Sequence, residues 1–232
     1  KLYNFLREME FNRLLSQAIS FYGEPNSKNL NSDIELKKTP KINTKLYKNI
    51  LKEKDLSQLI KDLNEQSIIS IDTETSSLNP QEAELIGISV SYAPNISYYI
   101  PLGHKHVNCL KKDLVIKKLK LILEDSSIKK VGQNIKYDFI VLKNNGIELD
   151  FMEDTMLLSY TIDAGNNRHN MDTLSELHLG HKTISYKDLV GTGKKQLNFS
   201  EVDLNKATEY AAEDADVTLR LYEILSERGE NE

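Results

Sequence analysis

Apolar positions at helical spacing alternate along this chain with polar stretches that have no period. Residues 1 to 22 repeat leucine, phenylalanine, methionine and isoleucine close to helical spacing, which predicts one amphipathic helix whose apolar face needs a partner. Residues 23 to 44 are polar and interrupted by proline and glycine, as linkers are. We therefore expect an appended N-terminal helix within 1–25, a linker at 26–44 and a domain at 45–232.

Short strands followed by helices fill the rest of the chain. A helix is predicted from Tyr47 to Leu63. Three strand-like runs separated by turn residues then indicate a meander, at 68–71, 85–90 and 98–100. Helical spacing follows, interrupted by a short strand near Val131, and predicts helices at 114–123, 135–143, 155–160, 172–179 and 204–225. This order predicts an α/β domain with a mixed central sheet flanked by helices.

Composition excludes several classes of protein. No apolar run approaches the roughly 20 residues of a membrane span, so we expect no membrane partner. The single Cys109 excludes an internal disulfide framework and a cysteine zinc site, and it suits a reducing cytoplasm. The net charge of −5 argues against holding nucleic acid by bulk attraction. A carboxylate-rich site can still bind phosphates through divalent metals, so nucleic acid stays open as a partner.

The first candidate site is a pair of acids, Asp72 and Glu74, directly after the apolar run 68–71. Residues i and i+2 of an extended chain project to the same face, so the two carboxylates repel each other at the end of a buried strand. A cation compensates such repulsion, and oxygen ligands suit magnesium or manganese. The alternative is a pair of surface acids at a strand end.

Two further pairs lie on predicted helices. Asn134 and Asp138 are four residues apart, and so are Tyr210 and Asp214, which places each pair on one helix face. Small alanines beside Tyr210 allow close approach to other backbone. The first pair also fits an asparagine cap with a solvated aspartate, and the second an ordinary amphipathic helix. Taken together, the four acids are hard to explain without metals, and two cations about 3.5–4 Å apart are the known solution for phosphodiester hydrolysis.

At these residues the chain resembles the proofreading 3′–5′ exonuclease domain of bacterial DNA polymerase I, a ribonuclease H-like family whose signature is four acids and a tyrosine. The resemblance runs from about Tyr47 to Leu225 and includes DTETSSLNP, YYIPLGH, VGQNIKYD, DTMLLSY, RHNMDTLSE, HKTISYKDLVGTGKKQLNFS and YAAEDADVTLRLY. The opening FLREMEFNRLL is similar to the last helix of the 5′-nuclease domain that precedes the exonuclease in such polymerases. Together with a start at Lys1, this leads us to expect an excised middle module.

The resemblance implies a role for each member of the signature. Asp72 would bridge two divalent ions, Mg²⁺ or Mn²⁺ with Zn²⁺ possible at one site. Glu74 and Asp214 would complete the first ion's ligands, and Asp138 would serve the second, through water. Tyr210 would orient the attacking water, because a tyrosine pKa near ~10 suits a positioning group better than a base. The expected product is a nucleoside 5′-monophosphate.

The resemblance also implies contacts with the substrate. Leu78 and Phe199 would form the apolar platform for the terminal bases, since a sequence-tolerant site stacks bases rather than reading their edges. Core packing is the alternative for both. The other candidates for contact with the 3′ end or its phosphates are Thr75, Gln133, Asn134, Tyr137 and Arg168. The implied partners are a single-stranded or frayed 3′ end of DNA and the polymerase and 5′-nuclease domains of the same chain, in the bacterial cytoplasm beside the nucleoid.

Two other functions stay open, and several residues are set aside. An RNA-trimming exonuclease of the ribonuclease D type shares the five catalytic residues, and a silent module would only hold a polymerase or bind 3′ ends. The segment 191–195 lacks the full phosphate-loop pattern and predicts a surface turn. His104 and His106 have no third ligand nearby, so we expect ordinary packing or surface roles. Asp154 is expected to cap a helix, and Asp216 to face away from Asp214.

Overall fold

The computed structural model describes residues 11, 14, 17–19 and 40–230 of the chain. The chain divides into two compact units, residues 1–39 and 40–232. Of the first unit, Leu14 and residues 17–19 are helical. Most of the appended helix predicted within 1–25, and the linker from 26 to 39, lie outside the described residues, so both stay predictions.

The described residues of the second unit form a six-stranded mixed sheet in the order β1-β4-β3-β2-β5-β6. Strands β2, β3 and β4 pair antiparallel in chain order, which confirms the predicted meander. Strands β5 and β6 continue the sheet in parallel beside β2, and β1 runs parallel to β4 at the other edge. The strands are β1 (Lys48–Asn49), β2 (Ile68–Thr75), β3 (Leu85–Ala93), β4 (Ile96–Pro101), β5 (Lys129–Gly132) and β6 (Met152–Asp154).

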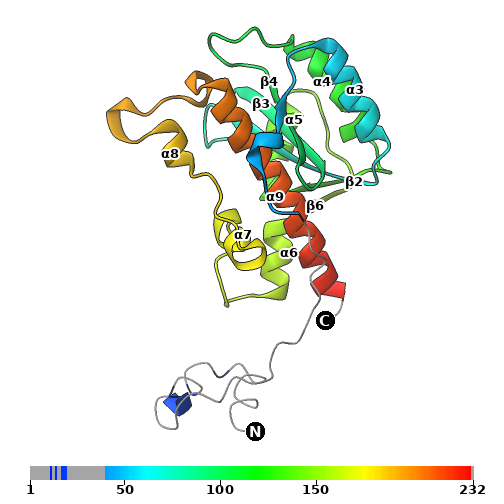
Figure 1. Cartoon of the computed structure of the whole chain (residues 1–232). Helices are drawn as coiled ribbons and strands as arrows, with labels where there is room; N and C mark the ends of the chain where they lie inside the picture. The colour runs from blue at the N-terminus through cyan, green and yellow to red at the C-terminus, as the bar shows by residue number, and fades with distance from the viewer. Residues whose placement is uncertain (1–10, 12–13, 15–16, 20–39, 231–232) are drawn as a thin grey trace. The chain divides into compact units, whose positions relative to one another are not determined.

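Helices cover the sheet (Figure 1). The α-helices are α3 (Glu53–Asn64), α4 (Lys112–Leu123), α5 (Ile135–Asn144), α6 (Thr155–Ile162), α7 (Met171–Leu179), α8 (Tyr186–Val190) and α9 (Leu204–Glu230), and the 3-10 turns are η1 (Thr44–Leu46), η2 (Gly193–Lys195) and η3 (Phe199–Glu201). Helix α9 is the longest of them, with 27 residues, and it crosses the sheet and contacts strands β1 to β5 (Figure 1).

The alternation of strand β2 separates an apolar face from a polar one. Ile69 and Ile71 are fully buried in the main core, together with side chains of α3, α4 and α5. Ser70, between them, faces α9, because its hydroxyl donates to the Ala215 carbonyl at 2.6 Å. Asp72 and Glu74 continue this second face, so the metal-binding candidates point toward α9 rather than into the apolar core.

Small residues let α9 lie close to the sheet. The Ser97 hydroxyl of β4 donates to the carbonyl of Ala212 at 2.7 Å, one turn from the Ser70 contact with Ala215. On β3, Gly87 leaves room for the Tyr99 ring, which an added Cβ would meet at 2.2 to 2.4 Å. The close approach expected of the alanines in this helix is therefore confirmed, and it fixes where α9 presents its polar side chains.

The N-terminal end of the domain differs from the prediction. The expected helix Tyr47–Leu63 begins only at Glu53, because the residues before it join the sheet edge. Lys48 pairs with Tyr98, the Ile50 amide donates to the Tyr99 carbonyl, and the Tyr47 hydroxyl donates to Asp216. Strand pairing and a buried hydrogen bond thus override helical spacing at these positions.

Strand β2 also runs further than predicted. The sequence places Asp72 and Glu74 after a strand that ends at Ile71, whereas β2 continues to Thr75 and pairs Asp72 with Ser89 and Glu74 with Gly87 of β3. The antiparallel partner supplies hydrogen bonds that keep the polar residues extended. Both acids therefore lie within the sheet, on a rigid element.

Candidate active site

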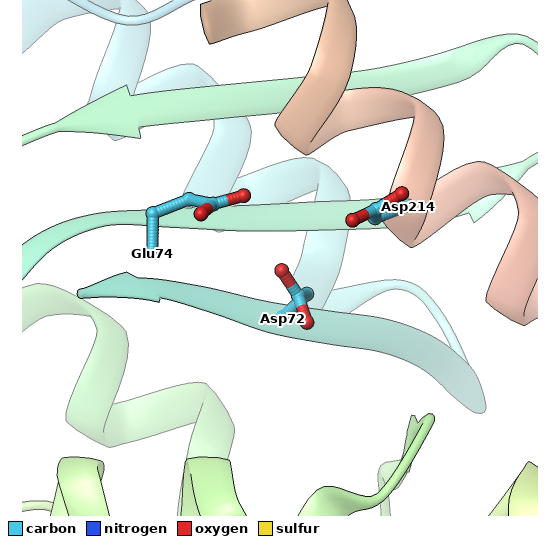
Figure 2. A group of neighbouring side chains, drawn as sticks. All are labelled: Asp72, Glu74 and Asp214. Atoms are coloured by element: carbon cyan, nitrogen blue, oxygen red, sulfur yellow. The ribbon is translucent and has the colours of Figure 1, made fainter. Parts of the chain in front are cut away.

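Three carboxylates from two elements meet above the sheet. Asp72 and Glu74 project from β2, and Asp214 projects from the α9 helix that crosses it. One oxygen of each side chain lies within 4.8 Å of the other two. Figure 2 shows the three carboxylates pointing toward a common space between strand and helix. The structure therefore brings together three of the four acids predicted to bind metal.

Because the three carboxylates lie close together and are mostly buried, the cluster is unstable when all three are negatively charged. Glu74 and Asp214 are buried, at 7% and 6% exposure, and Asp72 is partly accessible. Burial, followed by the charges of Asp138, Glu74 and Asp214, holds the pKa of Asp72 well above its usual value. Burial and then Asp214 and Asp138 raise the pKa of Glu74 in the same way. The cluster therefore needs protons or a cation to be stable.

The donor set fits a divalent cation. All the ligand atoms are carboxylate oxygens, which magnesium and manganese prefer. Among the described residues, the buried Oε1 atom of Glu74 has no hydrogen-bond partner. A buried carboxylate oxygen without a donor is costly, and a bound cation removes that cost. Asp72, Glu74 and Asp214 are thus suited to hold a metal ion.

The fourth acid, Asp138, approaches from a different element. It lies in the first turn of α5, buried at 3% exposure, and is not one of the three clustered ligands. Its Oδ1 atom accepts hydrogen bonds from the Thr73 amide at 2.9 Å and the Thr73 hydroxyl at 2.6 Å. Burial raises the pKa of Asp138 to about 7, and the Thr73 hydrogen bonds oppose that rise. Asp138 is near enough to raise the pKa of both Asp72 and Glu74.

Tyr210 lies one helical turn before Asp214 on α9, as its spacing predicted. Burial and then the charges of Asp214, Glu74 and Asp72 raise the pKa of the Tyr210 hydroxyl, which also hydrogen-bonds to Asp214. The phenol therefore stays protonated at neutral pH, donates its proton in a hydrogen bond to Asp214 and does not lose it to a base. This geometry suits a group that orients a water rather than a base.

Three predicted substrate contacts gather beside the end of β2. The hydroxyls of Thr75 and Tyr137 lie within hydrogen-bond distance of each other and of the Ser77 carbonyl. The same turn carries Leu78, whose side chain is 96% exposed. Core packing, the alternative for Leu78, is therefore wrong, and its side chain is free to meet a ligand.

Three further predicted contacts lie where β5 leads into α5 and on the loop before α7. The Gln133 side chain accepts from the Thr155 hydroxyl and donates to the His169 carbonyl at 2.8 Å, so it ties this loop to β5. Arg168, the neighbour of His169 on the loop, is exposed. Asn134 is exposed, adopts a left-handed backbone with φ 59°, and makes no side-chain cap. The capping alternative for Asn134 is therefore wrong.

The structure places Phe199 in the core instead of at the surface. It is 1% exposed and packs against Tyr99, His104, Tyr186 and Tyr210. Core packing, the alternative kept open for Phe199, describes this geometry, because four surrounding rings leave its faces no room for a base. The ring stacked parallel on Phe199 is Tyr186, which is 40% exposed and also contacts Tyr210.

The residues set aside from the sequence have structural roles. Asp154 accepts from the Met156 amide at 2.9 Å, which confirms the predicted cap of α6. Asp216 faces away from the acid cluster and binds Arg220 through both carboxylate oxygens. His104 is buried beside the Tyr99 hydroxyl, as ordinary packing requires. Gly191, Thr192, Gly193 and Lys195 are exposed, and both glycines have a positive φ, as in a surface turn.

Comparison with known proteins identifies the family. The family model described as 3′–5′ exonuclease matches residues 47–230. The chain belongs to this exonuclease family. DNA polymerase I of Rhizobium leguminosarum is 44% identical over 193 residues, covering 75% of this chain and 19% of that protein. DNA polymerase I of Borreliella burgdorferi is 41% identical over 183 residues, covering 78% of the chain and 20% of that protein.

The exonuclease domain thus spans about one fifth of the length of the polymerases that it matches. Solved structures agree on the ribonuclease H-like fold. Brucella melitensis NrnC has a TM-score of 0.60 at 23% identity, covering 80% of this chain and 81% of that one. Trypanosoma brucei RNase D has a TM-score of 0.65 at 18% identity, covering 77% and 64%. At such identities the likeness shows the fold alone.

Family membership makes the domain a 3′–5′ exonuclease hydrolase of the kind found in bacterial DNA polymerase I, and this family uses divalent metals. Among the described residues, no helix is both long enough and apolar enough to cross a membrane. The expected α/β fold with a mixed sheet is confirmed.

Sequence reasoning missed three residues around the exonuclease site. Thr73 stands between the two acids of β2, and strand alternation turns its side chain to the opposite face, away from the acid pair. Tyr186 is a lone aromatic residue in an irregular stretch, with no spacing to mark it. Glu213, beside Asp214, is buried and binds His181 at 2.8 Å and the Ile184 amide at 2.6 Å. It therefore ties the segment before Tyr186 to α9.

Proposed function

We propose that this domain hydrolyses the terminal phosphodiester at the 3′ end of single-stranded or frayed DNA and releases nucleoside 5′-monophosphates. It would act as the proofreading module of a DNA polymerase I. The observation that carries the proposal is the convergence of Asp72, Glu74 and Asp214 within 4.8 Å, with a buried oxygen of Glu74 lacking a donor among the described residues.

The acids divide into two groups around this centre. Asp72, Glu74 and Asp214 would hold one Mg²⁺ or Mn²⁺, with Zn²⁺ a possible occupant, and Asp138 together with Asp72 would serve a second ion. Divalent ions bound there lower the pKa of a water and neutralise charge on the phosphate. The chain's own part is to keep four oxygen donors fixed on a strand and two helices, so that little reorganisation is needed when the phosphate binds.

Tyr210 would orient the attacking water. Its hydroxyl remains protonated and donates to Asp214, so the phenol oxygen can accept a hydrogen bond from that water and orient it without acting as its base. The water oxygen attacks phosphorus in line as the water gives up one proton to the solvent, and the bond from phosphorus to the 3′ oxygen of the preceding nucleotide breaks. That oxygen takes the electron pair and then a proton, which leaves a shortened strand with a free 3′ hydroxyl.

Substrate contacts would surround this reaction centre. Leu78 is exposed and able to pack on a base, while Thr75 and Tyr137 stand beside it near the acids. Tyr186 covers Phe199 and would offer the stacking surface that Phe199 cannot offer from the core. Arg168 and Asn134 are exposed and would meet phosphates, with Gln133 holding the loop of Arg168.

The relatives support a proposal for the partners of this domain. They are DNA polymerase I proteins about five times longer than the match, so we propose that polymerase and 5′-nuclease domains belong to the same parent chain in a bacterial cytoplasm. A mispaired 3′ end frays, and the exonuclease would receive it as a single strand.

The proposal is tested by gel analysis of a 5′-labelled single-stranded DNA oligonucleotide with Mg²⁺ or Mn²⁺. We expect a ladder that shortens from the 3′ end, stops with a chelator, and forms faster on DNA than on an RNA oligonucleotide of the same sequence. Asp138→Ala should abolish the ladder and keep the far-UV circular dichroism of the wild type. Cleavage by this variant at the wild-type rate would contradict the assignment of Asp138.

Two outcomes separate the proposal from its alternatives. A faster ladder on RNA would favour an RNA-trimming exonuclease of the ribonuclease D type. A wild-type chain that forms no ladder with either metal, although it is folded, would favour a silent module that only binds 3′ ends or supports a polymerase.

A further inference from the structure

Thr73 connects the acid pair of β2 to the acid of α5. Its side chain alternates with those of Asp72 and Glu74, so it leaves the opposite face of the strand. It is buried at 7% exposure, and both its amide and its hydroxyl donate to Oδ1 of Asp138, at 2.9 and 2.6 Å. A single residue therefore supplies both donors to one oxygen of this carboxylate.

The topology of the sheet explains why this amide is available. Strand β5 pairs with β2 only as far as Ser70, and the chain then leaves the sheet at Gly132 and enters α5. Beyond Ser70 the edge of β2 has no parallel neighbour, and the amide of Thr73 would lack a partner. The first turn of α5 lies against this edge and fills the gap with the Asp138 carboxylate.

The two bonds restrict how Asp138 can act. An oxygen that already accepts two hydrogen bonds is a poor ligand for a cation, which leaves Oδ2 as the atom available to a metal or its water. A carboxylate held by one oxygen has a fixed orientation. Loss of a hydrogen-bond partner of a metal-binding side chain commonly lowers metal affinity by about 10- to 100-fold. Because Asp138 lies outside the cluster of Asp72, Glu74 and Asp214, this orientation matters for the second ion.

We propose that Thr73 is a positioning residue for the second metal site, acting through its hydroxyl on the Asp138 carboxylate. The inference rests on the proposed two-metal function. It gives the middle residue of the Asp-Thr-Glu sequence a role on the face of β2 opposite to the two acids. One short stretch of strand then organises both ions, directly through Asp72 and Glu74 and indirectly through Thr73.

The test measures Mn²⁺ binding in the absence of DNA. The electron paramagnetic resonance signal of the free ion gives the concentration of unbound Mn²⁺. Thr73→Val removes the hydroxyl, keeps a branched side chain, and leaves the backbone bond to Asp138. We expect the tighter Mn²⁺ site to be unchanged and the weaker site to lose about tenfold in affinity. The Mn²⁺ concentration that half-activates cleavage should rise by a similar factor. Thr73→Ser restores the hydroxyl and should restore both values.

Ser91→Ala is the matched control. Ser91 is also a fully buried hydroxyl on the sheet and donates to the Ile96 carbonyl at 3.0 Å, at the hairpin between β3 and β4. It should lower the Tm about as much as Thr73→Val and leave Mn²⁺ binding unchanged. Equal weakening of both Mn²⁺ sites by the two variants would overturn the proposal, because it would reveal a general loss of stability.

Wild type and Asp138→Ala complete the set. Wild type should bind two Mn²⁺ ions and cleave DNA, and Asp138→Ala should lose the weaker site. If both results hold but Thr73→Val behaves like wild type, the role of Thr73 is overturned while the two-metal function stands. A Thr73→Ser variant as defective as Thr73→Val would overturn it as well. If wild type itself neither binds Mn²⁺ nor cleaves, the proposed two-metal function fails together with the inference.

Discussion

The Tyr210 hydroxyl is held among three carboxylates, and that position determines what it can do. Burial and the charges of Asp214, Glu74 and Asp72 raise the pKa of this phenol, so it does not ionise near neutral pH. A group that cannot lose its proton contributes to catalysis by orienting a hydrogen bond. Removing such a group lowers kcat on the order of 100-fold.

Tyr210→Phe should therefore lower kcat on single-stranded DNA by about 100-fold and change KM little. The phenyl ring keeps the packing against Phe199 and Tyr186, so the Tm should stay within a few degrees of wild type. Steady-state kinetics at saturating Mg²⁺ provide the measurement. A variant with unchanged kcat would show that the hydroxyl does not take part in the reaction.

Tyr186 is the accessible ring of the aromatic cluster that includes Phe199. Stacking of a base on an aromatic ring contributes roughly 1–3 kcal/mol, which corresponds to about 5- to 150-fold in binding. Tyr186→Ala should raise KM for a DNA oligonucleotide within that range, while Tyr186→Phe keeps the ring and should retain the wild-type value. Phe151→Ala, which removes another exposed ring, serves as the control. Equal effects of the alanine and phenylalanine variants would exclude stacking.

At the scale of elements, Asp154 joins the beginnings of two helices. Its carboxylate accepts from the Met156 amide of α6 and from the amides of Asn134 and Ile135, where α5 begins. It thereby caps α6 and holds Asn134 in its left-handed conformation, which turns the chain from β5 into α5. The position of Asp138 in the first turn of α5 depends on this junction.

Asp154→Ala should therefore lower the free energy of unfolding by about 2 kcal/mol, since the loss of one helix cap typically costs about 1 kcal/mol. Urea denaturation measured at saturating and at zero Mg²⁺ provides the test. Asp55→Ala removes an exposed aspartate from the first turn of α3 and should change stability by no more than about 0.5 kcal/mol. Equal losses in the two variants would argue against the double cap.

At the scale of the whole molecule, the acid cluster should link stability to pH and metal. Burial raises the pKa of Asp138 to about 7. A carboxyl whose pKa is higher in the folded state than in the unfolded state adds stability that is complete below about pH 4. That stability is lost as pH rises toward 7. The metal-free domain should therefore lose stability over this window as the unfolded state ionises first.

Asp138→Asn removes this titration and can still accept the Thr73 hydrogen bonds. In a chelator, its Tm should exceed that of wild type by a gap that grows from pH 4 to 7 and then levels off. The gap should reach several degrees, because about 1 kcal/mol moves the Tm of a domain this size by roughly 2–4 °C. Saturating Mg²⁺ should raise the Tm of wild type more than that of the variant. A gap independent of pH would contradict this linkage.

His104 provides an internal check on that experiment. Burial lowers the pKa of this imidazole, so it removes stability as pH falls below about 6.5, opposite in direction to Asp138. Both proteins contain His104, so its contribution cancels in the Tm difference between them. Each protein alone should still lose stability at the acid end from this residue.

Local periodicity was enough for most elements of the fold. The alternation of Ile69 and Ile71 with polar residues, and the helical spacing along α9, arise from burial on one face and are visible within a single element. Two pairs of the signature were readable for the same reason, because Asp72 with Glu74 and Tyr210 with Asp214 share a face through local geometry alone.

Contacts distant in sequence decided what local pattern could not. Tyr47 lies outside its predicted helix, and its hydroxyl donates to Asp216. Phe199 packs in a core built from four other segments, and Asp138 accepts a hydrogen bond from Thr73 at the edge of β2. The sequence by itself determined which residues could share a face and carry charge. Only the tertiary structure decided which of them meet, because strand order and the end of β5 set the neighbours of each side chain.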